Sequence, residues 1–250
     1  MVQPPKSPSA ALPLLEVCVD DAPGLDAAVG AGAGRIELCS ALALGGLTPS
    51  AGLMARAAKT GVPVMAMIRP RGGEFCFTET EVEQMLAEID AVRAAGLTGV
   101  VLGANLPDNR LDLAVLKRLC AHAEGLDKTL HRAFDLVPDQ AQALEEAIDL
   151  GFSRVLTSGA AVTGLAGIER IRQLAEQATG RIGILPGGGI SAETAAPFLA
   201  LPGIHELHAS GSRAAAPASE MAQQFGFDLP GRRETHGPAI TALLKVMRGQ

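Results

Sequence analysis

The sequence contains no tryptophan and no tyrosine, and only 7 of its 250 residues are phenylalanine. A hydrophobic core must therefore be built from alanine, leucine, valine and isoleucine, and a hydrophobic fraction of 48% is sufficient for one. The 4 cysteines do not form a disulfide framework, and a reducing compartment would keep them as thiols. The formal net charge of -6 argues against a nucleic-acid partner or an anionic membrane surface, because both favour clustered positive charge.

No stretch of the chain approaches the roughly 18 consecutive apolar residues that a transmembrane helix needs. Residues 1–13 (MVQPPKSPSAALP) are rich in Pro, Ser and Ala and lack the charged start and apolar segment of a secretory signal. We predict that they form a disordered lead-in. We expect residues 14–250 to form a single domain of a cytoplasmic protein without a membrane partner.

Glycine recurs just before short apolar runs, at the points where helical patterns end. These glycines are Gly32, Gly61, Gly96, Gly125, Gly151, Gly180 and Gly203. Each stands where a helix that ends in a left-handed residue would place it, because glycine adopts positive φ without a steric penalty. Together with the opening run LLEVCVD at 14–20, the pattern predicts eight strands.

Helical periodicity lies between these runs, at residues 78–95, 138–150, 164–179 and 238–248. Alternation of strands and helices predicts βαβ units and a parallel sheet. Eight units favour an α/β protein of the (β/α)8 type, a TIM barrel, because an open doubly wound sheet usually has fewer strands. Residues 211–235 carry little helical pattern and several turn residues, which predicts a long loop that is functional or mobile.

Two of the predicted strands are interrupted in the same way, by a glutamate followed two residues later by a cysteine. Alternate residues of a strand face opposite sides. In LLEVCVD the aliphatic residues fit the outer face, so Glu16, Cys18 and Asp20 face the barrel interior. In RIELCS the same argument places Arg35, Glu37 and Cys39 inside. Cys18 and Cys39 therefore come close if the registers of the two strands match.

The active site of this fold lies at the carboxyl ends of the strands, where loops seven and eight usually form a phosphate site. Polar residues follow most of the predicted strands at this end. They are Arg69 and Arg71 after strand three, His131, Arg132 and Asp135 after strand five, Thr157 and Ser158 after strand six, Gly187, Gly188 and Gly189 after strand seven, and His208, Ser210 and Arg213 in strand eight and after it.

Structural roles remain open for several of these residues. Glu16 and Glu37 could form ion pairs with Arg35 or Arg69 instead of acting in catalysis, since buried charges are normally paired. Cysteines in apolar strands often behave as small hydrophobic residues. His131 could donate to a carbonyl group. No Lys-Ser/Thr follows the three glycines, so the sequence does not support a P-loop.

The assembled motifs resemble those of the CutC family of copper-homeostasis proteins. The motifs are LEVCVD at 15–20, RIELCSALALGGLTPS at 35–50, VPVMAMIRPRGGEFCF at 62–77, HRAFD at 131–135, RVLTSG at 154–159 and ILPGGGI at 184–190. The resemblance implies a TIM barrel and a cytoplasmic protein linked to copper handling. It also implies that Cys18 and Cys39 correspond to the cysteines proposed as Cu(I) ligands, and thiolate is a soft ligand that suits Cu(I).

Two functions follow as hypotheses. The first is a copper homeostasis protein that holds Cu(I) between Cys18 and Cys39. The second is an enzyme, of lyase or isomerase type, acting on a small anionic and potentially phosphorylated metabolite. Ala- and Leu-rich helix faces are compatible with a homodimer.

The enzyme hypothesis assigns roles to the residues at the strand ends. Glu16 or Glu37 would be the general base, and His131 and Asp135 would supply acid chemistry or orientation. The anion would be held by Arg69, Arg71, Arg132, Thr157, Ser158, Gly187, Gly188, Gly189, Ser210 and Arg213. A Schiff-base mechanism is disfavoured, because Lys128 begins its strand and no lysine stands at a strand end.

Overall fold

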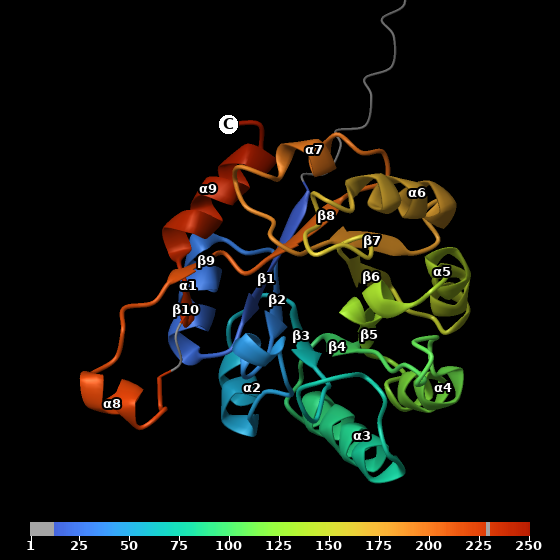
Figure 1. Cartoon of the computed structure of the whole chain (residues 1–250), viewed down its shortest axis with the longest axis horizontal. Helices are drawn as coiled ribbons and strands as arrows, with labels where there is room; N and C mark the ends of the chain where they lie inside the picture. The colour runs from blue at the N-terminus through green and yellow to red at the C-terminus, as the bar shows by residue number, and fades with distance from the viewer. Residues whose placement is uncertain (1–12, 229–230) are drawn as a thin grey trace, which may run out of the picture.

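Eight parallel strands form a barrel surrounded by helices in this computed structural model, which describes residues 13–228 and 231–250 (Figure 1). Almost all of the predicted disordered lead-in, residues 1–12, lies outside the described residues. The strands are β1 (Leu14–Val19), β2 (Arg35–Leu38), β3 (Val64–Met67), β4 (Gly99–Leu102), β5 (Asp127–Leu130), β6 (Arg154–Thr157), β7 (Gly183–Pro186) and β8 (Glu206–Ala209). The helices around them are α1 (Ala22–Ala31), α2 (Ala51–Ala57), α3 (Glu79–Ala94), α4 (Leu113–His122), α5 (Gln140–Asp149), α6 (Ile168–Ala178), α7 (Ala196–Leu199) and α9 (Gly237–Met247), with short 3-10 turns η1 (Leu42–Leu44) and η2 (Arg132–Leu136).

The strands pair in the order β7-β6-β5-β4-β3-β2-β1-β8, and β7 and β8 lie next to each other to complete the ring. The predicted (β/α)8 barrel is therefore confirmed. All seven glycines that mark the repeat have positive φ, from 73° at Gly96 to 96° at Gly32. The predicted helices are also present, and α3 begins with a capping box in which Thr78 and Glu81 satisfy each other's backbone N–H groups.

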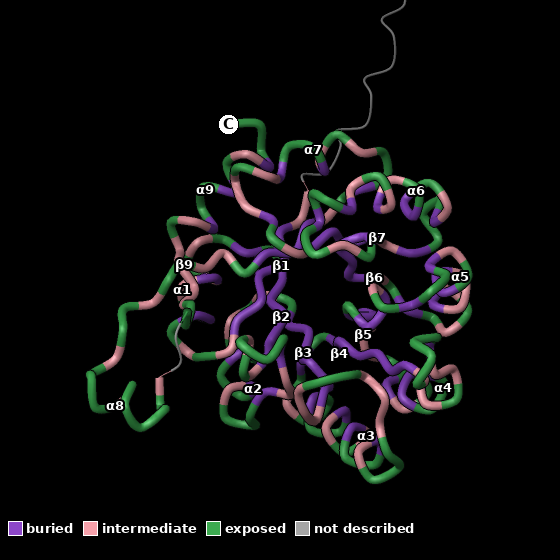
Figure 2. The backbone as a smooth tube through the Cα atoms, viewed as in Figure 1, coloured by how far each residue is buried: buried purple, intermediate pink, exposed green. Residues whose placement is uncertain are grey.

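The main hydrophobic core lies between the sheet and the surrounding helices. Val17 and Ile36 belong to it, together with the other aliphatic residues of their strands that the sequence assigns to the outer face. Figure 2 shows the strands buried and the outer surfaces of the helices exposed. The inward faces of β1, β2 and β8 instead carry charged residues. Packing thus places ionisable groups in the middle of the barrel.

Residues 211–235 contain more regular structure than the predicted long loop. They include β9 (Ser212–Ala214), α8 (Glu220–Gln224) and β10 (Arg233–Thr235), and β9 and β10 pair antiparallel beside α1 (Figure 1). Each three-residue strand is paired with a partner about twenty residues away in the sequence. A functional or mobile role for this segment stays a prediction. Across the described residues, no helix has the length and apolar character needed to cross a bilayer.

Candidate functional site in the barrel interior

A buried ion-pair network occupies the barrel interior around Glu16. Glu16 is 0% exposed, and its carboxylate accepts hydrogen bonds from Arg35 Nε and from His208 Nδ1, the latter at 2.8 Å. Register explains these contacts, because Arg35 and His208 are the Cα partners of Glu16 on β2 and β8. Arg35 also donates to Glu206 Oε2 at 2.6 Å. The structural ion pair considered for Glu16 is therefore present.

The charges of this network shift the pKa values of its members in opposite directions. Burial alone would raise the pKa of Glu16, but His208 and Arg35 outweigh it and hold the pKa at about 2. Burial alone would lower the pKa of His208, but the neighbouring Glu37, Cys18 and Glu16 raise it well above its ordinary value. At neutral pH His208 is therefore an imidazolium that donates from Nδ1 to Glu16.

The other ring nitrogen of His208 faces a thiol and a second carboxylate. Its Nε2 lies 3.8 Å from Glu37 Oε2. Cys18 Sγ, a carboxylate oxygen of Glu37 and a ring nitrogen of His208 all lie within 4.8 Å of one another. Burial raises the pKa of Glu37, and its Oε1 has no hydrogen-bond partner among the described residues. These three side chains, the Cys18–Glu37–His208 cluster, form a candidate metal site.

Cys39 lies beside this cluster but not within it. Cys18 has Glu37 as its Cα partner, so Cys39 lies two residues further toward the carboxyl end of the barrel. Its Sγ donates to Glu37 Oε2 at 3.6 Å, and its side chain packs with Met65 and Met67 inside the barrel. Burial raises the pKa of the Cys39 thiol well above its ordinary value. Both cysteines face inward as predicted, with Glu37 at the level of Cys18 and Cys39 one inward position further along β2.

Arg69 and His131 both contact the Phe75 ring at the carboxyl end of the barrel. The Arg69 guanidinium carbon is 4.8 Å from the centre of the Phe75 ring, and the ring centres of Phe75 and His131 are 4.7 Å apart. His131 Nδ1 accepts from the backbone N–H of Ala133 at 3.1 Å, instead of donating to a carbonyl group. Burial and the Arg69 charge lower the pKa of His131 to about 3, so its imidazole is neutral.

Asp135 anchors η2 to the end of β6. Its carboxylate accepts from Arg132 Nε at 2.7 Å, from Thr157 Oγ1 at 2.5 Å and from Ser158 Oγ at 2.9 Å. Arg132 Nη2 also donates to Ser158 Oγ at 2.6 Å. Four of the predicted site residues are therefore brought together, with the charge of Asp135 balanced by Arg132.

The three consecutive glycines lie beside this group. Gly187 donates to the Thr157 carbonyl at 2.9 Å, while Gly188 and Gly189 have φ values of 84° and 79°. A Cβ atom at Gly188 would lie 3.1 Å from Ser158 Cβ and 3.8 Å from Arg132 Cζ. Within the described part of the chain, the N–H groups of Gly188 and Gly189 donate no hydrogen bond. The Gly188 backbone therefore lies close to the Arg132 guanidinium.

The CutC family model matches residues 13–213, which include every element of the barrel from β1 to β8. The chain belongs to the CutC family. A CutC-family protein of Rhizobium meliloti (strain 1021) is 54% identical over 230 residues, covering 92% of this chain and 94% of that protein. One of Agrobacterium fabrum is 51% identical over 236 residues, covering 94% of each.

A solved CutC structure from Streptococcus agalactiae has the same fold, with a TM-score of 0.76 and 32% identity. The match covers 80% of this chain and 99% of that chain, and that protein is provisionally named for copper homeostasis. An aldolase named QR15 matches with a TM-score of 0.60 at 16% identity, over 78% of this chain and 90% of that one. The second likeness shows the barrel fold alone.

Three residues at or after strand ends that were predicted to bind an anion, Arg71, Arg213 and Ser210, have other hydrogen-bond partners. Arg71 donates to Glu81 Oε1 at 2.5 Å and to the Cys76 carbonyl at 2.7 Å, which ties the loop after β3 to α3. Arg213 forms an ion pair with Glu234 at 2.8 Å between β9 and β10. Ser210 Oγ is 2.9 Å from Ser212 Oγ. Anion binding by these residues stays a prediction.

His208 is a member of the candidate metal site to which sequence reasoning assigned no role. Its position in HASGSR was noted, but a histidine near a strand end is not distinctive by itself. The decisive contact arises because β8 pairs with β1 and places His208 opposite Glu16. One sequence signal could have drawn attention to His208. It is two residues from Glu206 in the same predicted strand, so both side chains face the same side of the sheet.

Proposed function

We propose that this CutC-family protein acts in copper homeostasis in the cytoplasm by binding Cu(I) inside its barrel. Cys18 and Cys39 would supply thiolate ligands, and His208 would supply an imidazole nitrogen. The observation that carries this proposal is the Cys18–Glu37–His208 cluster, whose ligand atoms lie within 4.8 Å of one another. Thiolate and imidazole suit copper, whereas carboxylate suits harder ions. The provisional name of the Streptococcus agalactiae protein supports the same function.

The hydrogen bonds around His208 suit a metal ligand. A ligating histidine usually donates its other ring N–H to a carboxylate, which fixes the orientation of the imidazole. His208 Nδ1 has such a partner in Glu16, and Arg35 in turn holds Glu16. Nε2 is then the nitrogen left to bind the ion. Glu37, whose Oε1 has no hydrogen-bond partner within the described residues, lies in the same cluster.

Metal binding at this cluster must displace protons. Cys18 and Cys39 have to become thiolates, and His208 has to lose its Nε2 proton, because ligands bind in their deprotonated forms. Glu37, whose pKa is raised by burial, lies 3.8 Å from that nitrogen and next to Cys18, so it can accept a proton as the ion enters. Cu(I) affinity should therefore rise with pH.

The test is a titration of the reduced protein with Cu(I) against a competing chelator, without oxygen. We expect Cys18→Ser combined with Cys39→Ser to weaken binding by more than the roughly 10–100-fold that loss of an outer-shell partner costs. His208→Gln should also weaken it, and Cys76→Ser, which removes a thiol from the loop after β3, should not. Unchanged affinity in the double variant would remove the proposal. Tighter binding of Zn²⁺ than of Cu(I) would identify zinc as the ion instead.

A second candidate function is an enzyme that acts on a small anionic metabolite at the carboxyl end of the barrel. It is favoured by the N–H groups of Gly188 and Gly189, which donate no hydrogen bond within the described residues, and by Arg132 beside Gly188, since such donors can hold an anion. Glu37 would act as the base, and neutral His131 would donate to developing negative charge. A thermal-shift screen with anionic metabolites tests this function, with Glu37→Gln as the comparison variant. Absence of any stabilising compound in a broad panel would reject it.

A further inference from the structure

Arg69 is a buried cation without a carboxylate partner. Its side chain is 5% exposed, and its terminal nitrogens donate to the carbonyl groups of Leu44, Gly46 and Gly73 at 2.6 to 3.1 Å. By contrast, Arg35 donates to two carboxylates. Buried charges are normally paired, because burial without a counter-charge is costly. Within the described residues, nothing neutralises the charge of Arg69.

Two buried hydrogen-bond donors at this place also have no acceptor. The first is Arg69 Nε. The second is His131 Nε2, on a side chain that is 3% exposed. Because His131 Nδ1 accepts from the Ala133 N–H group, the proton of the neutral ring is on Nε2. A buried donor without an acceptor is costly, so each of these atoms indicates a missing partner.

Both donors belong to one site. Both side chains contact the same Phe75 ring: the ring centres of His131 and Phe75 are 4.7 Å apart with the planes tilted by 43°, and the Arg69 guanidinium carbon is 4.8 Å from the Phe75 ring centre. Arg69 is near enough to His131 to disfavour its protonation. Arg69 follows β3 and His131 follows β5, so both lie at the end of the barrel where this fold places its ligands.

We propose that Arg69 and His131 bind the carboxylate of a small monocarboxylic acid at the carboxyl end of the barrel. One uncompensated positive charge calls for one negative charge. Two single N–H donors match the two oxygens of a carboxylate. A phosphate dianion brings more charge and more acceptor atoms than these donors satisfy. The proposal rests on the second candidate function and deepens it, because it names the carboxylate of a monocarboxylic acid as the substrate group that Arg69 and His131 would hold, and it is independent of copper.

The test measures binding without turnover, using the full-length reduced protein. Acetate, pyruvate and inorganic phosphate are titrated at constant ionic strength, and calorimetry is combined with nitrogen NMR of the His131 ring. We expect acetate and pyruvate to bind and to shift the His131 Nε2 resonance, with phosphate weaker by roughly tenfold or more. His131→Phe keeps a ring against Phe75 but removes the donor, and it should weaken pyruvate binding by roughly tenfold or more. Arg69→Lys, which keeps the charge and removes Nε, should act in the same direction.

Cys18→Ser is the matched control, since it should lose Cu(I) affinity and keep pyruvate binding. The proposal is overturned if neither acid binds, if phosphate binds as tightly, or if His131→Phe binds pyruvate like the wild type. If Arg69→Lys does not fold, the shift of the His131 Nε2 resonance when pyruvate binds to the wild-type protein still tests the proposal. Pyruvate binding without turnover of any monocarboxylic acid would retain this site and remove the enzyme function.

Discussion

Glu16→Gln is the substitution that most sharply tests the electrostatics of the barrel interior. Glu16 is fully buried and accepts hydrogen bonds from two cationic groups, Arg35 and His208. Glutamine has almost the same shape but no charge. The variant therefore leaves two buried cations with one counter-charge fewer, while packing stays nearly unchanged.

The size of the effect follows from the pKa of the carboxyl group. A folded-state pKa of about 2 against an ordinary value of 4.5 corresponds to about 3 kcal/mol of stability at neutral pH. Loss of one partner of a buried ion pair typically costs about 3–5 kcal/mol, which is the same order. Because the pKa is lowered, this stability is present above pH 4.5 and is lost as the pH falls toward 2.

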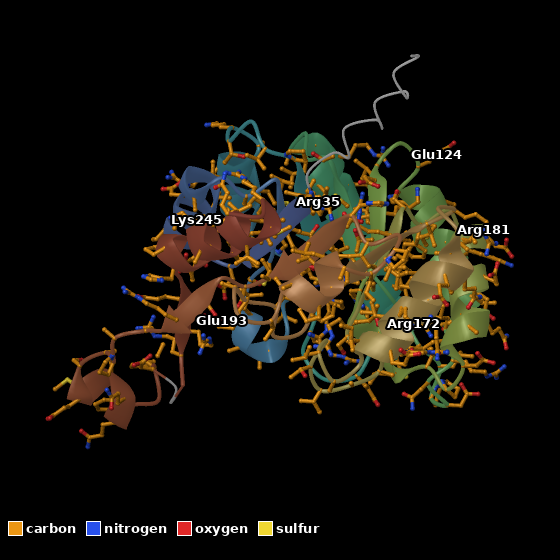
Figure 3. The ribbon with its side chains drawn as sticks, turned by 90° about the horizontal axis from the view of Figure 1, so that it is seen from above. Arg35, Glu124, Arg172, Arg181, Glu193 and Lys245 are labelled. Carbon is orange, nitrogen blue, oxygen red and sulfur yellow. The ribbon has the colours of Figure 1, made fainter. Side chains whose placement is uncertain are left out.

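Urea denaturation of the wild type and Glu16→Gln at several pH values measures this difference. We expect about 3 kcal/mol at pH 7, decreasing steadily below pH 4.5. Glu145→Gln is the matched control: Glu145 also has a lowered pKa, of about 2, but its partner is Arg181, an exposed side chain at the edge of the molecule (Figure 3). Exposed pairs contribute little, so this variant should stay close to the wild type. Equal effects of the two substitutions, or a difference at position 16 that does not depend on pH, would refute the reasoning.

Two further predictions concern residues near Glu16 and His131. The raised pKa of His208 means that its imidazolium stabilises the folded protein below its ordinary pKa of 6.5, and that this contribution is lost as the pH rises through the higher folded-state value. Denaturation from pH 6.5 upward should show falling stability in the wild type and a flatter profile in His208→Gln; parallel profiles would contradict this. Gly103→Ala would place a Cβ atom 2.6 Å from His131 Cε1 and 3.1 Å from Ala133 Cβ, so it should cost about 1–3 kcal/mol in urea denaturation. Gly52→Ala in α2 is the control, because the added Cβ atom would lie 4.0 Å from its nearest neighbour, Ser50 Oγ, and should not destabilise the protein. Similar stabilities of the two variants would show that an added Cβ at position 103 is not crowded against His131.

The barrel and the direction of its side chains could be predicted because both depend on local patterns. Gly32 ends a helix with positive φ whatever lies elsewhere in the chain. The alternation in β1 sends Val17 outward and Cys18 inward by the geometry of a single strand. Resemblance to the CutC family agreed with the barrel and added the link of the two cysteines to Cu(I), and the family model confirms the membership.

Register between strands could not be read from those patterns. Cys18 is opposite Glu37 instead of Cys39, and a shift of two residues preserves the inward direction, so alternation alone does not distinguish the two arrangements. The contact of His208 with Glu16 requires β8 to pair with β1, which are far apart in the sequence. The same holds for the pairing of β9 with β10.

The hydrogen-bond partners of Arg69 could not be predicted from the sequence either. Its position after β3 suggested anion binding, and Glu37 was considered as an ion-pair partner. The structure instead turns its terminal nitrogens to backbone carbonyl groups and leaves Nε without a partner. Backbone acceptors leave no signal in the identity of side chains, so this arrangement emerges only from the folded loops.

X-ray absorption at the copper edge tests the central claim most directly, because it reports the atoms around the ion. For the Cu(I)-loaded wild type we predict a shell that contains sulfur together with a nitrogen from His208. Sulfur should decrease in Cys18→Ser, and the nitrogen should be lost in His208→Gln. A shell without sulfur, or spectra that are the same in the wild type and both variants, would contradict a metal site built on the Cys18–Glu37–His208 cluster.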